Sequence, residues 1–250
     1  MTPEELLLEQ NLALRLEIKE LKVIHQNIWM LLVVVSRRLQ MTSASVKAAV
    51  TSLLDQDIFW DVSTEHEFLQ TINDSNDHVS DLSTLVSLVS RLQVGKIQLN
   101  LEPHVLQEIL SKLEDELSHR IEALNLVVDF PSEGAAVLVD YEYMMIALRL
   151  MFEALAGHQS HSANIHVVVK QLDKHWQLEI HSDEAIAIYK LVCNLSDSLT
   201  EEFLQVEQIL PETALKLYTA FQIFSLQEIK MEACEDKANN AVIQLAIPVA

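Results

Sequence analysis

The residue types that could do chemistry in this chain are mainly its ten histidines. His66 and His78 lie in a stretch that predicts a helix, and Asp81 follows His78 by three residues, so the two side chains can meet on the helix surface. His158, His161 and His166 form a second group. No cysteine or carboxylate is spaced among these three, which favours exposed loop and strand positions over a metal site. The chain contains no Walker, zinc or GxSxG motif.

Glycine is scarce, which limits the anion-binding loops that the chain can form. Only Gly95, Gly134 and Gly157 occur, whereas an average usage of about 7% would give roughly 18 glycines in a chain of this length. Loops that surround phosphate groups need glycine, because the backbone must approach the anion closely. The sequence therefore allows very few such loops.

The net charge of −20 at pH 7 argues against nucleic acid and anionic membrane surfaces as partners. The longest apolar run, residues 28–35, is too short to cross a bilayer, and Glu4, Glu5 and Glu9 speak against a signal peptide. The two cysteines lie about forty residues apart and form neither a metal motif nor a disulfide framework. We expect a cytoplasmic protein without a membrane segment.

The N-terminal part predicts a coiled coil over residues 1–28. Residues 5–57 contain no glycine or proline and indicate one long helix. Apolar residues recur in it every seven positions, with companions four residues later, as in a two-position heptad seam. The first set is Leu7, Leu14, Leu21 and Ile28, and the companions are Asn11, Ile18 and His25. A polar asparagine on such a seam favours a two-stranded dimer.

Residues 29–94 predict a helical hairpin. The segment 29–35 is apolar on every face, which requires burial all round, as in the middle of a bundle. The pattern breaks between Asp55 and Ser63, and a second helix with a broad apolar stripe runs from Ser63 to about Arg91. Hairpins from two chains would form a dimeric four-helix bundle.

Residues 95–250 mix strands with helices and predict a two-layer α/β sandwich, so the whole chain belongs to the α+β class. Helices are expected from Pro103 to about residue 124, from the cap residue Asp140 to residue 156, and over residues 212–226. The expected strands are residues 97–101, 126–130, 137–139, 165–170, 176–180, 229–233 and 241–247.

Several segments resemble the dimerisation and catalytic domains of sensor histidine kinases. Residues 91–103, with the sequence RLQVGKIQLNLEP, resemble the segment that leaves the second dimerisation helix. Residues 36–47, SRRLQMTSASVK, are similar to the phosphoacceptor box, whose usual form is SHELRTPLTSIK. This match places Arg37 on the phosphoacceptor histidine and Arg38 on the acidic residue beside it. A guanidinium group stays protonated and cannot act as the nucleophile. No histidine lies between His25 and His66, so no small shift restores it.

The nucleotide-binding boxes resemble the family pattern but depart from it at the residues that matter. On the helix similar to the asparagine-bearing one, Arg149 and Glu153 take the asparagine positions, although Glu153 could still ligate magnesium. Residues 181–188, HSDEAIAI, resemble the adenine-binding box. Asp183 matches the aspartate that binds the adenine amino group, while Ala185 and Ala187 replace both glycines.

The phosphate-binding part departs as well. The last glycine box is reduced to residues 212–217, ETALKL, where Glu212 would repel a triphosphate. The preceding lid-like stretch, about residues 196–211, carries no lysine or arginine that could neutralise one.

The resemblance thus implies a histidine-kinase shell without the reaction. We expect a catalytically inactive, homodimeric signalling scaffold that needs no cofactor, although residual Mg-ATP binding through Asp183 and Glu153 stays open. The implied partners are a response-regulator receiver domain or another histidine kinase. Arg37 and Arg38 are the partner-binding candidates, because they would bring positive charge to a receiver's acidic pocket.

Two alternatives stay open. The chain could relay phosphoryl groups as histidine phosphotransferases do, which keep a bundle histidine, and only His66 or His78 could serve. It could also be a purely structural dimerisation module.

Overall fold

The structure is a computed structural model. It describes residues 3–55, 60–121, 124–131, 134, 136–156, 163–172, 174–182, 188, 191–193, 211–235 and 241–250. The chain divides into two compact units, residues 1–96 and 97–250. The finer division into a coiled coil and a hairpin stays a prediction.

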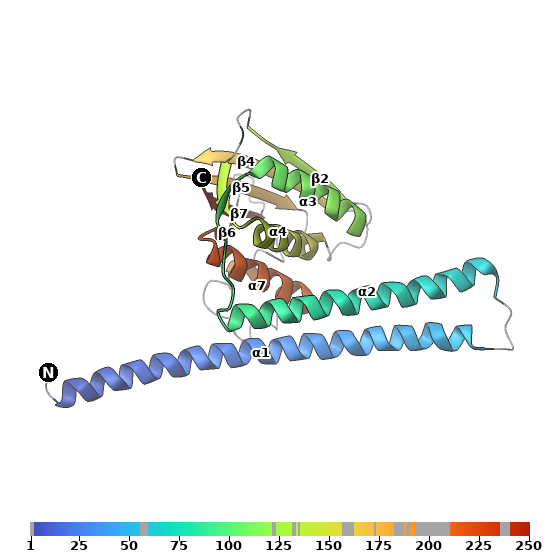
Figure 1. Cartoon of the computed structure of the whole chain (residues 1–250), viewed down its shortest axis with the longest axis horizontal. Helices are drawn as coiled ribbons and strands as arrows, with labels where there is room; N and C mark the ends of the chain where they lie inside the picture. Colours follow the sequence, from blue (N-terminus) through green and yellow to red (C-terminus); the bar gives the residue numbers. More distant parts are fainter. Residues whose placement is uncertain are drawn as a thin grey trace. The chain divides into compact units, whose positions relative to one another are not determined.

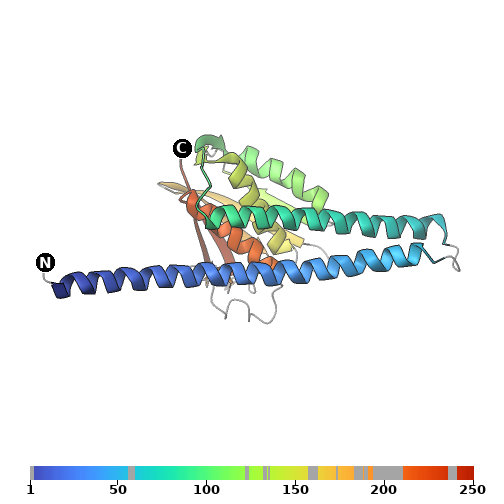
Figure 2. The same cartoon turned by 60° about the horizontal axis from the view of Figure 1, so that its bottom comes forward.

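The first unit is a hairpin of two long helices, α1 (Pro3–Leu53) and α2 (Val62–Gln93). They run side by side, and α1 extends beyond α2 at its N-terminal end (Figures 1 and 2). The predicted hairpin is therefore confirmed. In the single chain, the buried apolar residues of α2 are Leu82, Leu85, Leu88 and Val89, and among the α1 side chains that the structure describes they are Leu31, Val34 and Ala49.

Both helix ends at the turn of the hairpin differ from the prediction. The first helix ends at Leu53 and not at residue 57. There the indole Nε1 of Trp60 donates a hydrogen bond to the carbonyl oxygen of Ser52 at 2.9 Å. This side-chain donor satisfies a carbonyl group of the last turn, which has no partner within the helix. The second helix begins at Val62, because Asp61 and not Ser63 is its N-cap.

The second unit is built on a five-stranded sheet of order β2-β4-β5-β7-β6. Its strands are β2 (Leu124–Asp129), β4 (Ala163–Leu172), β5 (His175–Ser182), β7 (Ala241–Pro248) and β6 (Lys230–Glu235). β2 and β4 pair in parallel and every other pair is antiparallel. Three helices cover one face of this sheet, α3 (Leu106–Arg120), α4 (Tyr141–Ala156) and α7 (Pro211–Leu226) (Figure 1). The predicted α/β sandwich is confirmed.

The alternation of buried and partly exposed residues along the strands decides which face of the sheet the helices cover. In β5, every second residue from Trp176 to Ile180 is buried, whereas the residues between them are partly exposed. The same alternation runs from Ile243 to Ile247 in β7. Strand side chains point alternately to the two faces, so one apolar set forms the core with the helices. α4 supplies more of the helical part than either α3 or α7, and its Phe152 is fully buried.

The segment that follows α2 differs from the sequence-based expectation. Residues 97–101 form no strand, and Pro103 lies inside strand β1 (Glu102–Val105) and does not open a helix. β1 pairs antiparallel with β3 (Ala136–Val139), with Pro103 opposite Leu138. A proline is tolerated here because, among the described residues, β1 pairs with β3 alone, so its other edge needs no donor. Helix α3 consequently begins three residues later, at Leu106.

Candidate functional site

Two packed helices, α4 and α7, bring four charged side chains of the second unit together. On α4, Arg149 Nε lies 4.0 Å from Glu153 Oε1, one helical turn along. On α7, Lys216 Nζ lies 3.5 Å from Glu212 Oε1, again one turn apart. The link between the helices is an ion pair of 3.0 Å between Lys216 Nζ and Glu153 Oε2. We call these four residues the α4–α7 ion network.

The burial of the network falls towards its ends. The side chain of Glu153 is 13% exposed, that of Lys216 is 22%, and the side chains of Arg149 and Glu212 are about equally exposed, at 29% and 30%. Each oxygen of the Glu153 carboxylate faces a cation, and the formal charges of the four residues cancel. An ion pair that is largely withdrawn from water is screened less than one on the surface. Glu153 thus lies between the cationic groups of Arg149 and Lys216.

Apolar packing of the two helices sets this geometry. The neighbours of the network along the chain, Phe152, Ala154, Leu215 and Leu217, are all buried. They hold α4 against α7, and the charged residues lie where the packed face of each helix meets solvent. Spacings of four residues place Arg149 beside Glu153 and Glu212 beside Lys216 on the same helix faces.

Of the predicted nucleotide-pocket residues, the structure brings together Arg149, Glu153 and Glu212. Asp183, Ala185 and Ala187 lie outside the described residues, as do residues 196–210 of the lid-like stretch. The sequence reasoning missed the role of Lys216. Its spacing of four from Glu212 was a signal that could have been used, but the contact with Glu153 depends on how α7 packs on α4.

The candidates of the first unit lie on its helices. Arg37 is exposed on α1 and Arg38 is partly buried. Thr42, which falls on the proline of the phosphoacceptor box, is buried, at 8% exposure. His66 and His78 are exposed on α2. The arrangement therefore presents a guanidinium group to solvent at the position that the resemblance assigns to the nucleophile.

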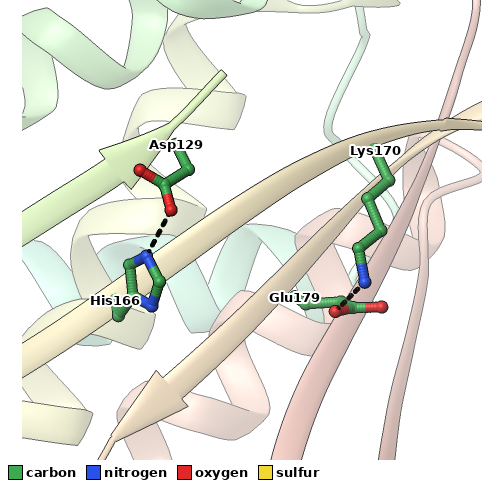
Figure 3. A network of polar contacts seen from close by, with 4 residues as sticks. All are labelled: Asp129, His166, Lys170 and Glu179. Atoms are coloured by element: carbon green, nitrogen blue, oxygen red, sulfur yellow. Dashed lines mark hydrogen bonds and ion pairs between the residues drawn. The ribbon is translucent and has the colours of Figure 1, made fainter. Parts of the chain in front are cut away.

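A second polar cluster lies on the side of the sheet opposite the helices (Figure 3). His166 Nε2 on β4 lies 2.7 Å from Asp129 Oδ2 on β2, and both side chains are well exposed. His181, directly opposite His166 on β5, has its ring centroid 6.0 Å from that of His166. Lys170 and Glu179 form an ion pair further along the same two strands.

This cluster does not amount to a metal site. His158 and His161, which the sequence groups with His166, lie outside the described residues. Within the part of the chain that the structure describes, no group of three or more histidine, cysteine, aspartate or glutamate side chains is arranged to hold a metal ion. Nor is any helix in that part long and apolar enough to cross a membrane.

Comparison with known proteins places this arrangement in a known fold. No protein-family model matches the chain, and no curated protein does. Among solved structures, Acinetobacter baumannii histidine kinase AdeS matches with a TM-score of 0.58 and 13% identity, over 84% of this chain and 96% of that one. Full-length ShkA, solved in complex with AMPPNP, matches with a TM-score of 0.54 and 11% identity, over 87% of this chain and 46% of that one. Both likenesses extend over most of the present chain, so it has the fold of the histidine kinases.

Proposed function

We propose that this protein is a catalytically inactive, histidine-kinase-like homodimer that acts as a scaffold in two-component signalling. Its partner would be a response-regulator receiver domain or another histidine kinase. The observation that carries the proposal is Arg37, an exposed arginine on α1 at the position where the resemblance places the phosphoacceptor histidine.

The chemistry of the available groups supports inactivity. A guanidinium group has no lone pair to attack a phosphorus atom at any relevant pH. The residue beside it, Arg38, cannot serve as a general base for the same reason. In the second unit, Glu153 could ligate magnesium by type, but both its oxygens already face cations of the chain itself. Autophosphorylation would thus lack a nucleophile and a base, and the metal ligand would be occupied.

Exposed apolar side chains on α1 support the dimer. The heptad residues Leu14, Ile18, Leu21 and Ile28 are between 45% and 59% exposed in the single chain. Further along the helix, Trp29 and Leu32 are 62% and 56% exposed. Only part of the all-apolar stretch 29–35 is therefore covered by the chain itself. A second hairpin would bury the remaining surface, which agrees with the two-stranded preference of Asn11.

Positive charge on α1 suits a receiver domain, because the phosphorylation pocket of a receiver is acidic. Arg37 is the better probe of this surface, since it is exposed whereas Arg38 is partly buried and has interactions of its own. Lys47 is also exposed and lies ten residues further along the same helix. It offers a matched control, because its reversal changes the net charge equally.

The test is binding of purified receiver domains from the host's two-component systems, with and without phosphorylation, measured by calorimetry. Arg37→Glu should weaken binding at least tenfold, and Lys47→Glu should leave it within about twofold. Equal effects of the two variants would mean that only overall charge matters. Receiver binding that neither variant changes would contradict the assigned docking site. If no receiver binds, native mass spectrometry with the host's kinases tests the heterodimer.

Calorimetry with Mg-ATP up to millimolar concentration tests the inactive pocket. We expect no binding. Binding that Asp183→Ala removes would mean that the pocket still takes nucleotide as a ligand.

His66 and His78 allow a competing relay function, because both are exposed on α2 and imidazole can accept a phosphoryl group. Incubation with a phosphorylated receiver distinguishes the two functions. Phosphate transfer that is lost in His78→Ala or His66→Ala would replace the scaffold with a phosphotransferase. If the dimer binds neither a receiver nor a kinase, the remaining function is that of a purely structural dimerisation module.

A further inference from the structure

A stripe of exposed residues runs along α1, apart from the side of the helix that packs on α2. Its members are spaced by three and four residues in turn, as in a heptad seam. All are exposed in the single chain: Leu14, Ile18, Leu21, His25, Ile28 and Leu32. Leu31 and Val34, which are buried in the hairpin, occupy other heptad positions. α1 also extends beyond the end of α2 (Figure 1), so α2 cannot cover the first turns of the stripe.

The charged residues beside this stripe favour a second copy of the chain, in parallel orientation, as its occupant. Glu17 directly precedes Ile18, Lys22 directly follows Leu21, and both charged side chains are exposed. In a parallel two-stranded coiled coil, residues that flank the seam at this spacing of five face each other across the two helices. Glu17 of each copy therefore meets Lys22 of the other, and both pairs are attractive.

His25 lies on the stripe between the layers of Leu21 and Ile28. In a parallel dimer its imidazole meets the imidazole of the second copy. Histidine is the side chain whose charge changes between about pH 5 and 8. Two neutral imidazoles each have one donor and one acceptor and can share a hydrogen bond, whereas two protonated ones have donors only. Protonation also places two positive charges in a layer that is partly withdrawn from water, where like charges repel strongly.

The charged groups around His25 do not compensate for this repulsion. On α1, Lys22 is the sole charged residue within four positions of His25. On α2, the last three turns carry one charged residue, Arg91, which has interactions of its own. The second copy brings the same residues to the seam. Glu17 pairs with Lys22 of the other copy and is eight residues from His25, about 12 Å along the helix.

We propose that His25 makes the homodimer sensitive to pH. The parallel coiled coil forms while both imidazoles are neutral, above about pH 7, and protonation weakens it below about pH 6. This inference rests on the homodimer of the proposed function and adds a regulation of that dimer.

The test is the dissociation constant of the full chain, measured by sedimentation equilibrium at about pH 7.5 and about pH 5.8. We expect the dissociation constant of the dimer to rise at least tenfold at the lower pH, together with faster hydrogen exchange of residues 14–28. His25→Asn keeps a polar seam residue, as at Asn11, but removes the titrating ring. Its dissociation constant should change by less than about threefold over the same range, because an amide gains no charge.

Two further variants separate the seam from general effects of pH. His25→Leu should give a tighter dimer than the unaltered protein at both pH values, because it completes the apolar seam. His119→Asn is the matched control. It removes an exposed histidine from the last turn of α3, in the second unit, and should keep the full pH response of the unaltered protein.

The possible failures can be told apart. A dimer with the same dissociation constant at both pH values, or an undiminished pH response in His25→Asn, would overturn the role of His25 and leave the homodimer intact. A monomer at both pH values would overturn the homodimer and this inference with it. Because His25 is exposed in the single chain, its replacement removes no buried contact of the hairpin, and circular dichroism at each pH checks that the variants are folded.

Discussion

Replacing Asp140 with alanine should destabilise the second unit by about 2–4 kcal/mol, because this buried aspartate connects three segments of the chain. Its Oδ1 accepts a hydrogen bond from the backbone N–H of Tyr143 at 3.1 Å, which caps helix α4. Its Oδ2 accepts one from the backbone N–H of Asn100 at 2.8 Å, in the segment that follows α2. Its own backbone N–H donates to Gln227 Oε1 at 2.7 Å.

The magnitude follows from the two side-chain bonds. Loss of an N-cap costs about 1 kcal/mol. A hydrogen bond to a charged group contributes about 1.5–3 kcal/mol, and Asn100 is exposed, so water can replace part of that contribution. The backbone bond to Gln227 survives the substitution. The Nε2 of that buried glutamine has no hydrogen-bond partner among the described residues, so the region already contains one unsatisfied donor.

Urea denaturation followed by far-ultraviolet circular dichroism measures the loss, and hydrogen exchange of residues 97–105 shows whether the segment after α2 is released. Asp140→Asn is the matched control. It keeps one oxygen acceptor, so its cost should lie between those of the unaltered protein and Asp140→Ala. A cost below about 1 kcal/mol for Asp140→Ala, or unchanged exchange over residues 97–105, would refute the reasoning.

Three further outcomes are expected. Hydrogen bonding from the backbone of Thr64 holds the pKa of Asp61 below its usual value of 3.8. The hydrogen bond to Asp61 should therefore stabilise the start of α2 fully above that value, and this stabilisation should disappear as the pH falls through the lowered pKa. Asp61→Ala should accordingly increase hydrogen exchange of α2 at neutral pH but not in strong acid. Phe152→Ala removes a fully buried ring and should lower the free energy of unfolding in urea by roughly 3–5 kcal/mol. A decrease below about 1 kcal/mol would mean that α4 does not form the middle of the core. Ile18 lies on the predicted seam and is 52% exposed in the single chain. Ile18→Asp should therefore give a folded monomer in analytical ultracentrifugation. An unchanged dimer would argue against that seam.

Local patterns predicted the elements that carry their own signals. Helix α4 follows from its cap residue Asp140 and a run of strong helix formers without glycine or proline. The strands β4 and β5 are predicted by the alternation of apolar and polar residues on either side of a short polar turn. The match that places Arg37 at the phosphoacceptor position also rests on residue type, and it stays a prediction. These features depend on neighbours within a few residues, and for this reason the sequence alone determines them.

Pairing between distant segments could not be predicted in the same way. Apolar and polar residues alternate over 97–101 as in a strand, yet the segment that pairs is Glu102–Val105. It pairs because β3, which comes some 35 residues later in the sequence, lies beside it in the fold. The contact of Lys216 with Glu153 likewise joins residues 63 positions apart and exists only because α7 packs on α4. The sequence determined the helical hairpin and the α/β character of the second unit. The tertiary structure alone decided which charges meet, because the contacts that bring them together form between segments whose local patterns do not specify each other.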